Sequence, residues 1–473
     1  MVPRVPRARR RAPRRRHPPR AERHAAHADG QRPRGGARRG AGGLAAPARR
    51  RHGADVGGRA RAARAVRVAL LLLLAGSAPA AAQLVVSPAG PYTDLAAAVR
   101  AARPGERITV RPGTYRTQDV VVDRAVEIAG EGAPVLDAGG EHQVLVVRAD
   151  GVTVRGLVFR NVHTSFISDR AALVFDSVGA CVAEDNRFEG TFFGIYLARS
   201  RDCRVARNTF RGSFRDEANS GNAIHLWGTV RTTVTGNDIT GHRDGIYLEF
   251  ARHVTVAGNR SHRNLRYGLH FMFSDSCAYD RNRFEGNGAG VAVMYTRHVR
   301  MTGNDFLDNW GPTAYGLLLK DINDSHVEGN RFAGNTTGLH LEGSNRVRVA
   351  GNVFERNGWA VRLLGNSEDG RLEGNRFTAN TFDMTTNSAS ARAMLLGNEW
   401  DAYRGHDLDG DGWGDVPHQP VRLFAILVQD NEPALILLRS VFVDLLEVAE
   451  RVLPVLAPRG LVDERPRVRR GVS

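Results

Sequence analysis

The hydrophobic and polar positions of this chain repeat with a period of about 22 residues. Each repeat contains an Asn followed two positions later by an apolar residue, usually Phe, and successive Asn residues lie 22 to 29 positions apart. Between them run short apolar–polar alternations, broken by Gly and Asn, which are typical of β-strands joined by tight corners. The repeat Asn residues are Asn186, Asn208, Asn237, Asn259, Asn282, Asn304, Asn330, Asn352, Asn375 and Asn398.

This pattern excludes a helical solenoid, because no stretch inside the repeat has a period of about 3.6 residues. We predict an all-β fold, a right-handed parallel β-helix of the pectin-lyase-like type, in which coils stack at about 4.8 Å. The repeat Phe residues are expected to point inward as an aromatic ladder. The Asn side chains are expected at the corners, where they hydrogen-bond locally and to the next coil.

Both ends of such a solenoid need caps, because an open sheet edge invites aggregation. Residues 94–103 (DLAAAVRAAR) have a helical pattern and suit an N-terminal cap. Residues 433–455 also read as a helix, but more of its circumference is apolar than one core face requires. This C-terminal helix either caps the solenoid or docks onto a partner, and the sequence favours neither.

Charge divides the chain into segments. Residues 1–67 hold 21 Arg against three acidic residues, a net charge of +18. Because the whole chain carries +16, the residues after 67 carry a net charge of about −2. Residues 1–60 form an Arg-rich leader that we expect to be disordered. A basic arm for nucleic acid is one interpretation. We favour an upstream mis-start of translation, and predict no nucleic-acid partner.

Residues 61–82 have the features of a secretory signal peptide: Arg residues, a short apolar run and small residues before a cleavage site after Ala82. The apolar run is too short for a stable membrane span. We therefore expect a secreted chain with a parallel β-helix over residues 83–420. Residues 421–473 would hold the C-terminal helical cap or docking segment and a tail.

The chain has three cysteines, Cys181, Cys203 and Cys277, each five positions before a repeat Asn. Other coils have Val at this position, which indicates an inward core position. Cys181 and Cys203 lie one coil apart, so they are close enough to pair. We nevertheless expect buried free thiols, because an odd, low count does not describe a disulfide scaffold.

One strand of each coil places outward side chains in two vertical stripes. The first includes His225, His270 and His340, and the second includes Met272 and Met294 on adjacent coils. Imidazole and thioether ligands together suit Cu(I), a soft ion. The alternative is a packing patch across coils. His270, Met272 and Met294 are our candidate copper ligands, with His225 and His340 as weaker candidates.

Two repeats carry insertions, at residues 211–222 and 307–316, immediately before the strand that carries the stripes. Insertions on one face of a solenoid usually mark its binding face. The His and Met residues lie between the two insertions, which supports a binding role for this face.

A second candidate metal site lies in residues 407–415 (DLDGDGWGD), where acidic side chains alternate. Alternating carboxylates with a Gly at the turn match the start of a calcium-binding loop, although the closing Glu of an EF-hand is missing. We favour structural Ca²⁺ over a bare acidic turn. Its candidate ligands are Asp407, Asp409, Asp411 and Asp415.

Many parallel β-helices cleave or epimerise acidic polysaccharides, so a uronate polymer lyase or epimerase is the alternative function. Such sites need clustered carboxylates with a basic residue. The stripes instead carry aromatic residues, His and Met, with Glu249 and Asp244 isolated. We therefore predict that the chain is not an enzyme.

Three stretches resemble the NosD family, the periplasmic β-helix proteins required for maturation of nitrous oxide reductase. They are residues 270–274 (HFMFS), residues 292–296 (AVMYT) one coil later, and the closing residues 398–417 with the Asp-rich loop. The resemblance covers roughly residues 85–450. The paired Met motifs followed by this loop are more specific than the repeat itself.

This resemblance implies a periplasmic, non-enzymatic maturation factor that handles copper transiently as Cu(I). It implies four partners: an ABC transporter permease and its ATPase, a lipoprotein copper chaperone, and nitrous oxide reductase. Contact with the membrane would then run through the transporter. A metal-free structural adaptor remains a third interpretation.

Overall fold

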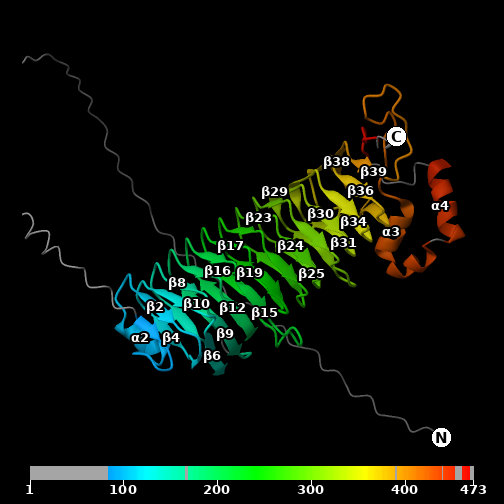
Figure 1. The fold of residues 1–473 in the computed structure, drawn as a ribbon. Helices are drawn as coiled ribbons and strands as arrows, with labels where there is room; N and C mark the ends of the chain where they lie inside the picture. The colour runs from blue at the N-terminus through cyan, green and yellow to red at the C-terminus, as the bar shows by residue number, and fades with distance from the viewer. Residues whose placement is uncertain (1–83, 166–168, 389–390, 439, 453–460, 469–473) are drawn as a thin grey trace, which may run out of the picture. The chain divides into compact units, whose positions relative to one another are not determined.

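The computed structural model describes residues 84–473, apart from 166–168, 389–390, 439, 453–460 and 469–473. The leader (1–60) and the signal peptide (61–82) therefore lie outside the described residues. The described chain is the predicted all-β parallel β-helix, built from three long parallel sheets that we name A, B and C. Figure 1 shows the sheets running side by side from α2, in blue, to α3, in orange.

From β2 onward each coil contributes one strand to each sheet, so successive strands of one sheet differ by three in their numbering. Sheet A contains β1 (Leu84–Val86), β2 (Arg107–Val110), β5 (Glu127–Gly130), β8 (Thr153–Arg155), β11 (Val182–Glu184), β14 (Arg204–Ala206), β17 (Thr233–Thr235), β20 (Thr255–Ala257), β23 (Ala278–Asp280), β26 (Arg300–Thr302), β29 (Asn323–Glu328), β32 (Asn345–Ala350), β35 (Gly370–Glu373) and β38 (Ala393–Leu396). Sheet B contains β3 (Thr114–Arg116), β6 (Val135–Gly140), β9 (Val158–Val162), β12 (Arg187–Thr191), β15 (Thr209–Arg211), β18 (Asp238–Thr240), β21 (Arg260–His262), β24 (Arg283–Glu285), β27 (Asp305–Leu307), β30 (Arg331–Ala333), β33 (Val353–Glu355), β36 (Arg376–Thr378) and β39 (Glu399–Trp400). Sheet C contains β4 (Val120–Val122), β7 (Leu145–Val147), β10 (Ala171–Asp176), β13 (Phe193–Ala198), β16 (Ile224–Trp227), β19 (Asp244–Glu249), β22 (Tyr267–Met272), β25 (Ala289–Met294), β28 (Tyr315–Lys320), β31 (Thr337–Glu342), β34 (Trp359–Leu363) and β37 (Phe382–Thr385).

The core is the interior of the solenoid, filled by inward residues of all three sheets. The predicted aromatic ladder runs along sheet B in two stretches, interrupted where Ile239 and Ser261 replace Phe. Neighbouring rings stack with centroids 4.1 to 5.7 Å apart. Stacking in register buries each ring completely, so this ladder fixes the alignment of successive coils.

The repeat Asn residues form a buried ladder, as predicted. In each coil the Asn side-chain amide donates to the Oδ1 of the next Asn, as Asn186 does to Asn208 at 3.1 Å. A second ladder, which we did not predict, lies five positions after six of these Asn residues. It runs through Asn264, Asn287, Asn309, Asn335, Asn357 and Asn380.

A capping segment that we did not predict, residues 461–468, closes the C-terminal end of the first Asn ladder. The buried carboxylate of Asp463 accepts hydrogen bonds from the backbone N–H and side-chain amide of Asn398, each at 3.0 Å. It also accepts one from the indole N–H of Trp400 at 3.1 Å. An Asp supplies the acceptor that the next Asn of the ladder would have supplied, so the last coil keeps its hydrogen bonds.

The N-terminal cap agrees with the prediction. Helix α2 (Leu95–Ala101) begins after Asp94, whose side chain accepts the N–H of Ala97 at 2.7 Å. Its apolar face, including Leu95 and Val99, is buried against the first coil. A capped helix therefore covers the open end of the core.

The prediction of free thiols was wrong for Cys181 and Cys203, which form a disulfide with a Cα–Cα distance of 4.5 Å. The two residues occupy the same inward position in adjacent coils, next to the paired strands β11 and β14. Stacking of parallel strands holds such positions within the range of about 4.4 to 6.8 Å that a disulfide spans. Cys277 is free and buried, as predicted.

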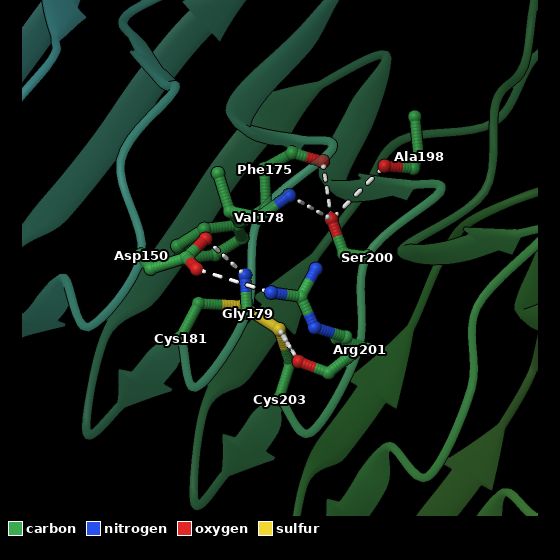
Figure 2. Close-up of a disulfide and its surroundings, with 9 residues drawn as sticks. All are labelled: Asp150, Phe175, Val178, Gly179, Cys181, Ala198, Ser200, Arg201 and Cys203. Carbon is green, nitrogen blue, oxygen red and sulfur yellow. Dashed lines mark hydrogen bonds and ion pairs between the residues drawn. A yellow bond between two sulfur atoms is a disulfide. The ribbon is translucent and has the colours of Figure 1, made fainter.

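Figure 2 shows the disulfide beneath a corner held by polar contacts. The Asp150 carboxylate accepts the backbone N–H of Gly179 at 2.7 Å and pairs with the guanidinium of Arg201 at 3.2 Å. The Ser200 hydroxyl accepts the N–H of Val178 at 3.3 Å. These contacts tie successive coils together, so the disulfide has a structural role.

The predicted C-terminal helix over residues 433–455 is present as α4 (Val441–Val452), but the first part of that range forms the separate 3₁₀ helix η1 (Glu432–Leu437). A further helix that we did not predict, α3 (Leu423–Asp430), precedes both. They pack on the outer face of sheet C, where Phe424, Ala425 and Val428 contact Trp359 and Phe382. Since the capping segment closes the core, these helices cover the side of the solenoid.

Candidate functional site

The outer face of sheet C carries the two predicted stripes. Strand pairing aligns the first stripe in register as Tyr196, His225, Tyr247, His270, Ala292, Leu318, His340 and Arg362. The second stripe aligns as Ala198, Trp227, Glu249, Met272, Met294, Lys320 and Glu342. Side chains two positions apart share one face of a strand, so the stripes lie side by side.

Three predicted ligands meet in this face. Met272 and Met294 are direct register partners on β22 and β25, and His270 lies two positions before Met272 on the same face. Both methionines are half-buried, and His270 is buried. The Tyr247 hydroxyl lies 3.8 Å from the Met272 sulfur. The structure therefore places one buried imidazole and two half-buried thioethers next to one another on the outer face of sheet C.

The imidazole of His270 faces a buried carboxylate. Its Nδ1 lies 3.8 Å from Oδ2 of Asp244, too long for a hydrogen bond, and has no other partner among the described residues. Asp244 is itself held by the guanidinium of Arg266 through two contacts of 2.9 and 2.6 Å. Although burial opposes ionisation, the hydrogen bonds and the positive charge of the Arg266 guanidinium keep the pKa of Asp244 below its ordinary value.

This buried ion pair reaches one of the predicted insertions. Arg266 also binds Glu217 of the 211–222 insertion, with Nη1 and Oε1 2.7 Å apart. The aromatic rings of Tyr267 and Tyr247 flank His270, with centroids 4.7 and 4.9 Å away. The position of His270 is thus set by two tyrosines and by a carboxylate tied to the insertion.

The two weaker candidates lie apart from this cluster. His225 is two coils from His270, roughly 10 Å away, and His340 is three coils away in the other direction, roughly 14 Å. Both are buried, and neither ring nitrogen of His225 has a partner among the described residues. Burial lowers the pKa of His225 to about 3 and that of His340 to about 4.

An exposed aromatic edge, which the sequence analysis missed, lies beside the methionines. Phe250, Phe273 and Tyr295 each follow a residue of the second stripe and stack with centroids 5.3 and 5.2 Å apart. Their exposed fractions are 51%, 43% and 42%. All three have positive φ angles, of 54°, 49° and 56°, a conformation that is costly for bulky residues. The recurrence of an aromatic residue directly after Glu249, Met272 and Met294 is the signal that could have identified this edge.

The acidic loop brings three of its four predicted carboxylates close together. Side-chain oxygen atoms of Asp407, Asp409 and Asp411 come within 4.8 Å of one another. Asp415 is not in that group, and its carboxylate accepts the backbone N–H of Leu408 at 2.7 Å. Three carboxylates at this spacing offer oxygen ligands of the kind that Ca²⁺ prefers.

The carboxylates of the stripes do not form the pair that a polysaccharide-cleaving site needs. Glu249 and Glu342 lie four coils apart, roughly 19 Å. Glu342 is paired with Lys320 at 2.6 Å.

The helices on the side of sheet C leave apolar residues uncovered. In α4, Val443 and Leu446 pack toward α3. The opposite face is exposed and consists of Val441, Phe442, Leu445, Val448 and Val452. An exposed apolar face of this extent on an ordered helix is typical of a protein interaction site. Among the described residues, no helix is both long enough and apolar enough to cross a membrane.

The fold places the chain among the parallel β-helix proteins, with His270, Met272 and Met294 close together on one outer face. Comparison with known sequences narrows this class. Residues 211–408 match the model of the family described as "Periplasmic copper-binding protein (NosD)". The chain is 30% identical over 425 residues to the "Probable ABC transporter binding protein NosD" of Pseudomonas aeruginosa, covering 77% of this chain and 88% of the relative. The chain belongs to the NosD family.

A second relative with the same name, from Stutzerimonas stutzeri, is 26% identical over 453 residues, covering 84% of this chain and 93% of that protein. Among solved structures, the chain resembles the A-module of mannuronan C-5 epimerase AlgE6 from Azotobacter vinelandii, at 17% identity and a TM-score of 0.48, covering 67% of this chain and 90% of that one. It also resembles a mannuronic acid specific polysaccharide family 6 lyase from human gut microbiota, at 12% identity and a TM-score of 0.49. This match covers 63% of this chain and 82% of that one. Likenesses this distant carry no argument about activity.

Proposed function

We propose that this protein is a periplasmic, non-enzymatic maturation factor for nitrous oxide reductase, which delivers copper for the enzyme's copper–sulfur centre together with an ABC transporter. The observation that carries the proposal is the in-register pair Met272 and Met294 beside His270, in a member of a copper-binding family. The names of both relatives refer to ABC transporter binding. A lipoprotein chaperone would supply the copper, and the transporter's permease and ATPase would be the membrane partners.

The proposed site suits transient binding of Cu(I). Thioether sulfur and imidazole nitrogen are ligands that a soft monovalent copper ion accepts. Because Met272 and Met294 are half-buried, a second protein can replace them as ligands without unfolding the sheet. The disulfide between Cys181 and Cys203 supports a periplasmic location, since disulfides persist in that oxidising compartment.

A complementation experiment tests the maturation role. In a denitrifying bacterium that lacks its own NosD-family protein, expression of this chain should restore copper-loaded, active nitrous oxide reductase. The variant with Met272→Ala and Met294→Ala should not restore it, although the variant is made and exported at normal levels. Normal loading of the reductase by that variant would rule out copper delivery through this site.

We further propose that Asp244 is a positioning residue for His270. A small shift would let Nδ1–H of His270 donate to Asp244 and leave Nε2 free for copper, as in many metal sites where a carboxylate orients a histidine. Asp244→Asn should therefore weaken Cu(I) binding about 10- to 100-fold, measured by competition with a chelator.

Asp137→Asn is the matched control. The Asp137 carboxylate forms an ion pair with the Arg160 guanidinium at 2.7 Å, and Asp137 lies on sheet B, away from the stripes. It should leave Cu(I) affinity unchanged. If Asp244→Asn and Asp137→Asn have the same affinity for Cu(I), Asp244 has only a structural role.

We propose that His225 is a buried histidine that stays neutral in the folded chain. Its pKa falls to about 3 from an ordinary 6.5, so its contribution to stability is complete above pH 6.5 and is lost as the pH falls toward 3. Between pH 7 and pH 5 this loss amounts to about 2 kcal/mol. Between pH 7 and pH 5 the free energy of unfolding of His225→Phe should therefore fall by about 2 kcal/mol less than that of the wild type. Urea unfolding at both pH values measures this difference. Equal losses would contradict the assignment.

The Asp-rich loop is proposed to bind one Ca²⁺ ion that steadies the capping segment. Asp411 pairs with Arg465 of that segment at 3.0 Å, and the N–H of Gly414 donates to the Pro466 carbonyl at 2.8 Å. Ca²⁺ at 100 times its dissociation constant should raise the unfolding free energy by about 2.7 kcal/mol. Asp407→Asn combined with Asp409→Asn should abolish this gain in thermal unfolding. An equal gain in that variant would place the ion elsewhere.

A further inference from the structure

Glu249 is the residue that directly precedes the two methionines in the second stripe. It is the register partner of Met272, which in turn pairs with Met294 on the next coil. The three residues therefore follow one another at the coil spacing of about 4.8 Å. All three side chains lie on the outer face of sheet C and are half-buried. A carboxylate thus lies directly beside the two thioethers.

The Glu249 carboxylate has no ion pair among the described residues. The basic side chains toward both ends of the same stripe are paired with other acids. Lys320 pairs with Glu342 at 2.6 Å, and Arg199, which follows the first residue of the stripe, pairs with Asp176 at 2.6 Å. A half-buried negative charge without a partner is costly, so a cation bound beside Glu249 would stabilise it.

The neighbouring His270 supplies a nitrogen atom for such a cation. It lies on the coil next to that of Glu249, two positions before Met272 on the same face of β22. Strand geometry places the Cα atoms of Glu249 and His270 roughly 8 Å apart, so both side chains can reach one ion between them. In the described part of the chain Nε2 of His270 has no partner and, unlike Nδ1, it is not completely buried.

These two ligands differ in chemistry from the methionines. Carboxylate oxygen and imidazole nitrogen suit Cu(II), whereas thioether sulfur selects Cu(I) and is at most a weak ligand of Cu(II). The stripes therefore hold two overlapping sets of ligands, one on each side of Met272. The imidazole of His270 belongs to both sets.

We propose that Glu249 extends the copper site, so that the site binds Cu(II) as well as Cu(I). Cu(I) is bound by the sulfur atoms of Met272 and Met294 with Nε2 of His270. Cu(II) is bound by the same Nε2 with a carboxylate oxygen of Glu249. Because the imidazole is shared, one ion is bound at a time, and the chain retains copper in either oxidation state. This inference rests on the copper site of the proposed function.

The test is titration of the whole secreted chain with Cu(II) against a competing chelator, with electron paramagnetic resonance of the bound ion. The wild type should bind one Cu(II) ion through nitrogen and oxygen. Glu249→Gln should weaken this binding about 10-fold or more, because a ligand and its charge are lost. The affinity of this variant for Cu(I) should fall about fivefold or less, since only one half-exposed charge is removed from that set of ligands.

The variant with Met272→Ala and Met294→Ala should show the opposite preference. It should lose Cu(I) binding but keep its affinity for Cu(II) to within about fivefold, because thioethers contribute little to Cu(II). Glu141→Gln is the matched control, since Glu141 is exposed between β6 and β7 and has no ion pair in the described part of the chain. It should bind both ions as the wild type does.

Three results would overturn the proposal: no Cu(II) bound by the wild type, equal Cu(II) affinity in the wild type and Glu249→Gln, or equal weakening of both ions by Glu249→Gln. Failure of the proposed function gives a different result. A wild type that binds no Cu(I), or Cu(I) binding that persists without Met272 and Met294, would contradict the copper site itself.

Discussion

Replacing Met272 and Met294 together with alanine should weaken Cu(I) binding by about 100-fold or more, in a titration of the purified chain against a competing chelator. The two residues are direct register partners, so both sulfur atoms are expected to bind the same ion. Removal of both leaves His270 as the one proposed ligand. Loss of residues that merely orient ligands already costs about 10- to 100-fold, so loss of two ligands should cost at least as much.

Met394→Ala is the matched control, because Met394 is half-exposed on β38 of sheet A, away from the stripes. This variant should bind Cu(I) like the wild type. Met272 and Met294 are half-buried, so the double variant should also remain folded. Unchanged Cu(I) affinity in the double variant would leave the stripe as a packing patch, which is the alternative that the sequence left open.

The second large effect is expected at the exposed face of α4, which we propose as the contact with the ABC transporter. Leu445→Glu combined with Val448→Glu should reduce binding to the purified transporter roughly 100-fold or more, since the centre of an interface loses about 2 kcal/mol or more per essential residue. The two side chains are 63% and 53% exposed, so the folded chain should keep its stability. The measurement is surface plasmon resonance with the permease–ATPase complex in detergent.

Val121→Glu provides the control for added charge, because Val121 is 43% exposed on β4, near the other end of the solenoid. It should not alter transporter binding. If the α4 variant binds the transporter as tightly as the wild type, this apolar face has another partner.

The fold was predictable because the solenoid is periodic. Each coil repeats one set of inward residues, so the spacing of Asn186 and its successors fixes both the strand order and the register. The same spacing is sufficient to align Met272 with Met294, and the two are register partners in the folded chain. Local sequence thus determines the neighbours of every residue within the repeat.

Features outside the repeat were not predictable in this way. Asp463 closes the Asn ladder from a position 65 residues after Asn398, and no period connects the two. The C-terminal helix was predicted over residues 433–455 because its apolar residues are dense, but the first part of that range forms η1 and packs, with α3, against Trp359 and Phe382. Such long-range contacts depend on tertiary structure and override local propensity.

In the candidate site, too, contacts between repeat positions were predictable and contacts outside the repeat were not. Stacking placed His270 beside the methionines, as the sequence indicated. Asp244 lies on β19, one coil from His270, and its approach to the imidazole depends on the buried pair with Arg266, which spacing does not reveal. The sequence left open whether Cys181 pairs with Cys203. The folded chain brings their Cα atoms to 4.5 Å, and the two residues form a disulfide.

The most direct test of the central claim is X-ray absorption spectroscopy of the Cu(I)-loaded chain. We predict a copper ion coordinated by two thioether sulfur atoms and one imidazole nitrogen, with the sulfur signal lost in the variant lacking Met272 and Met294. Coordination by nitrogen and oxygen alone, or a sulfur signal that persists in that variant, would contradict it.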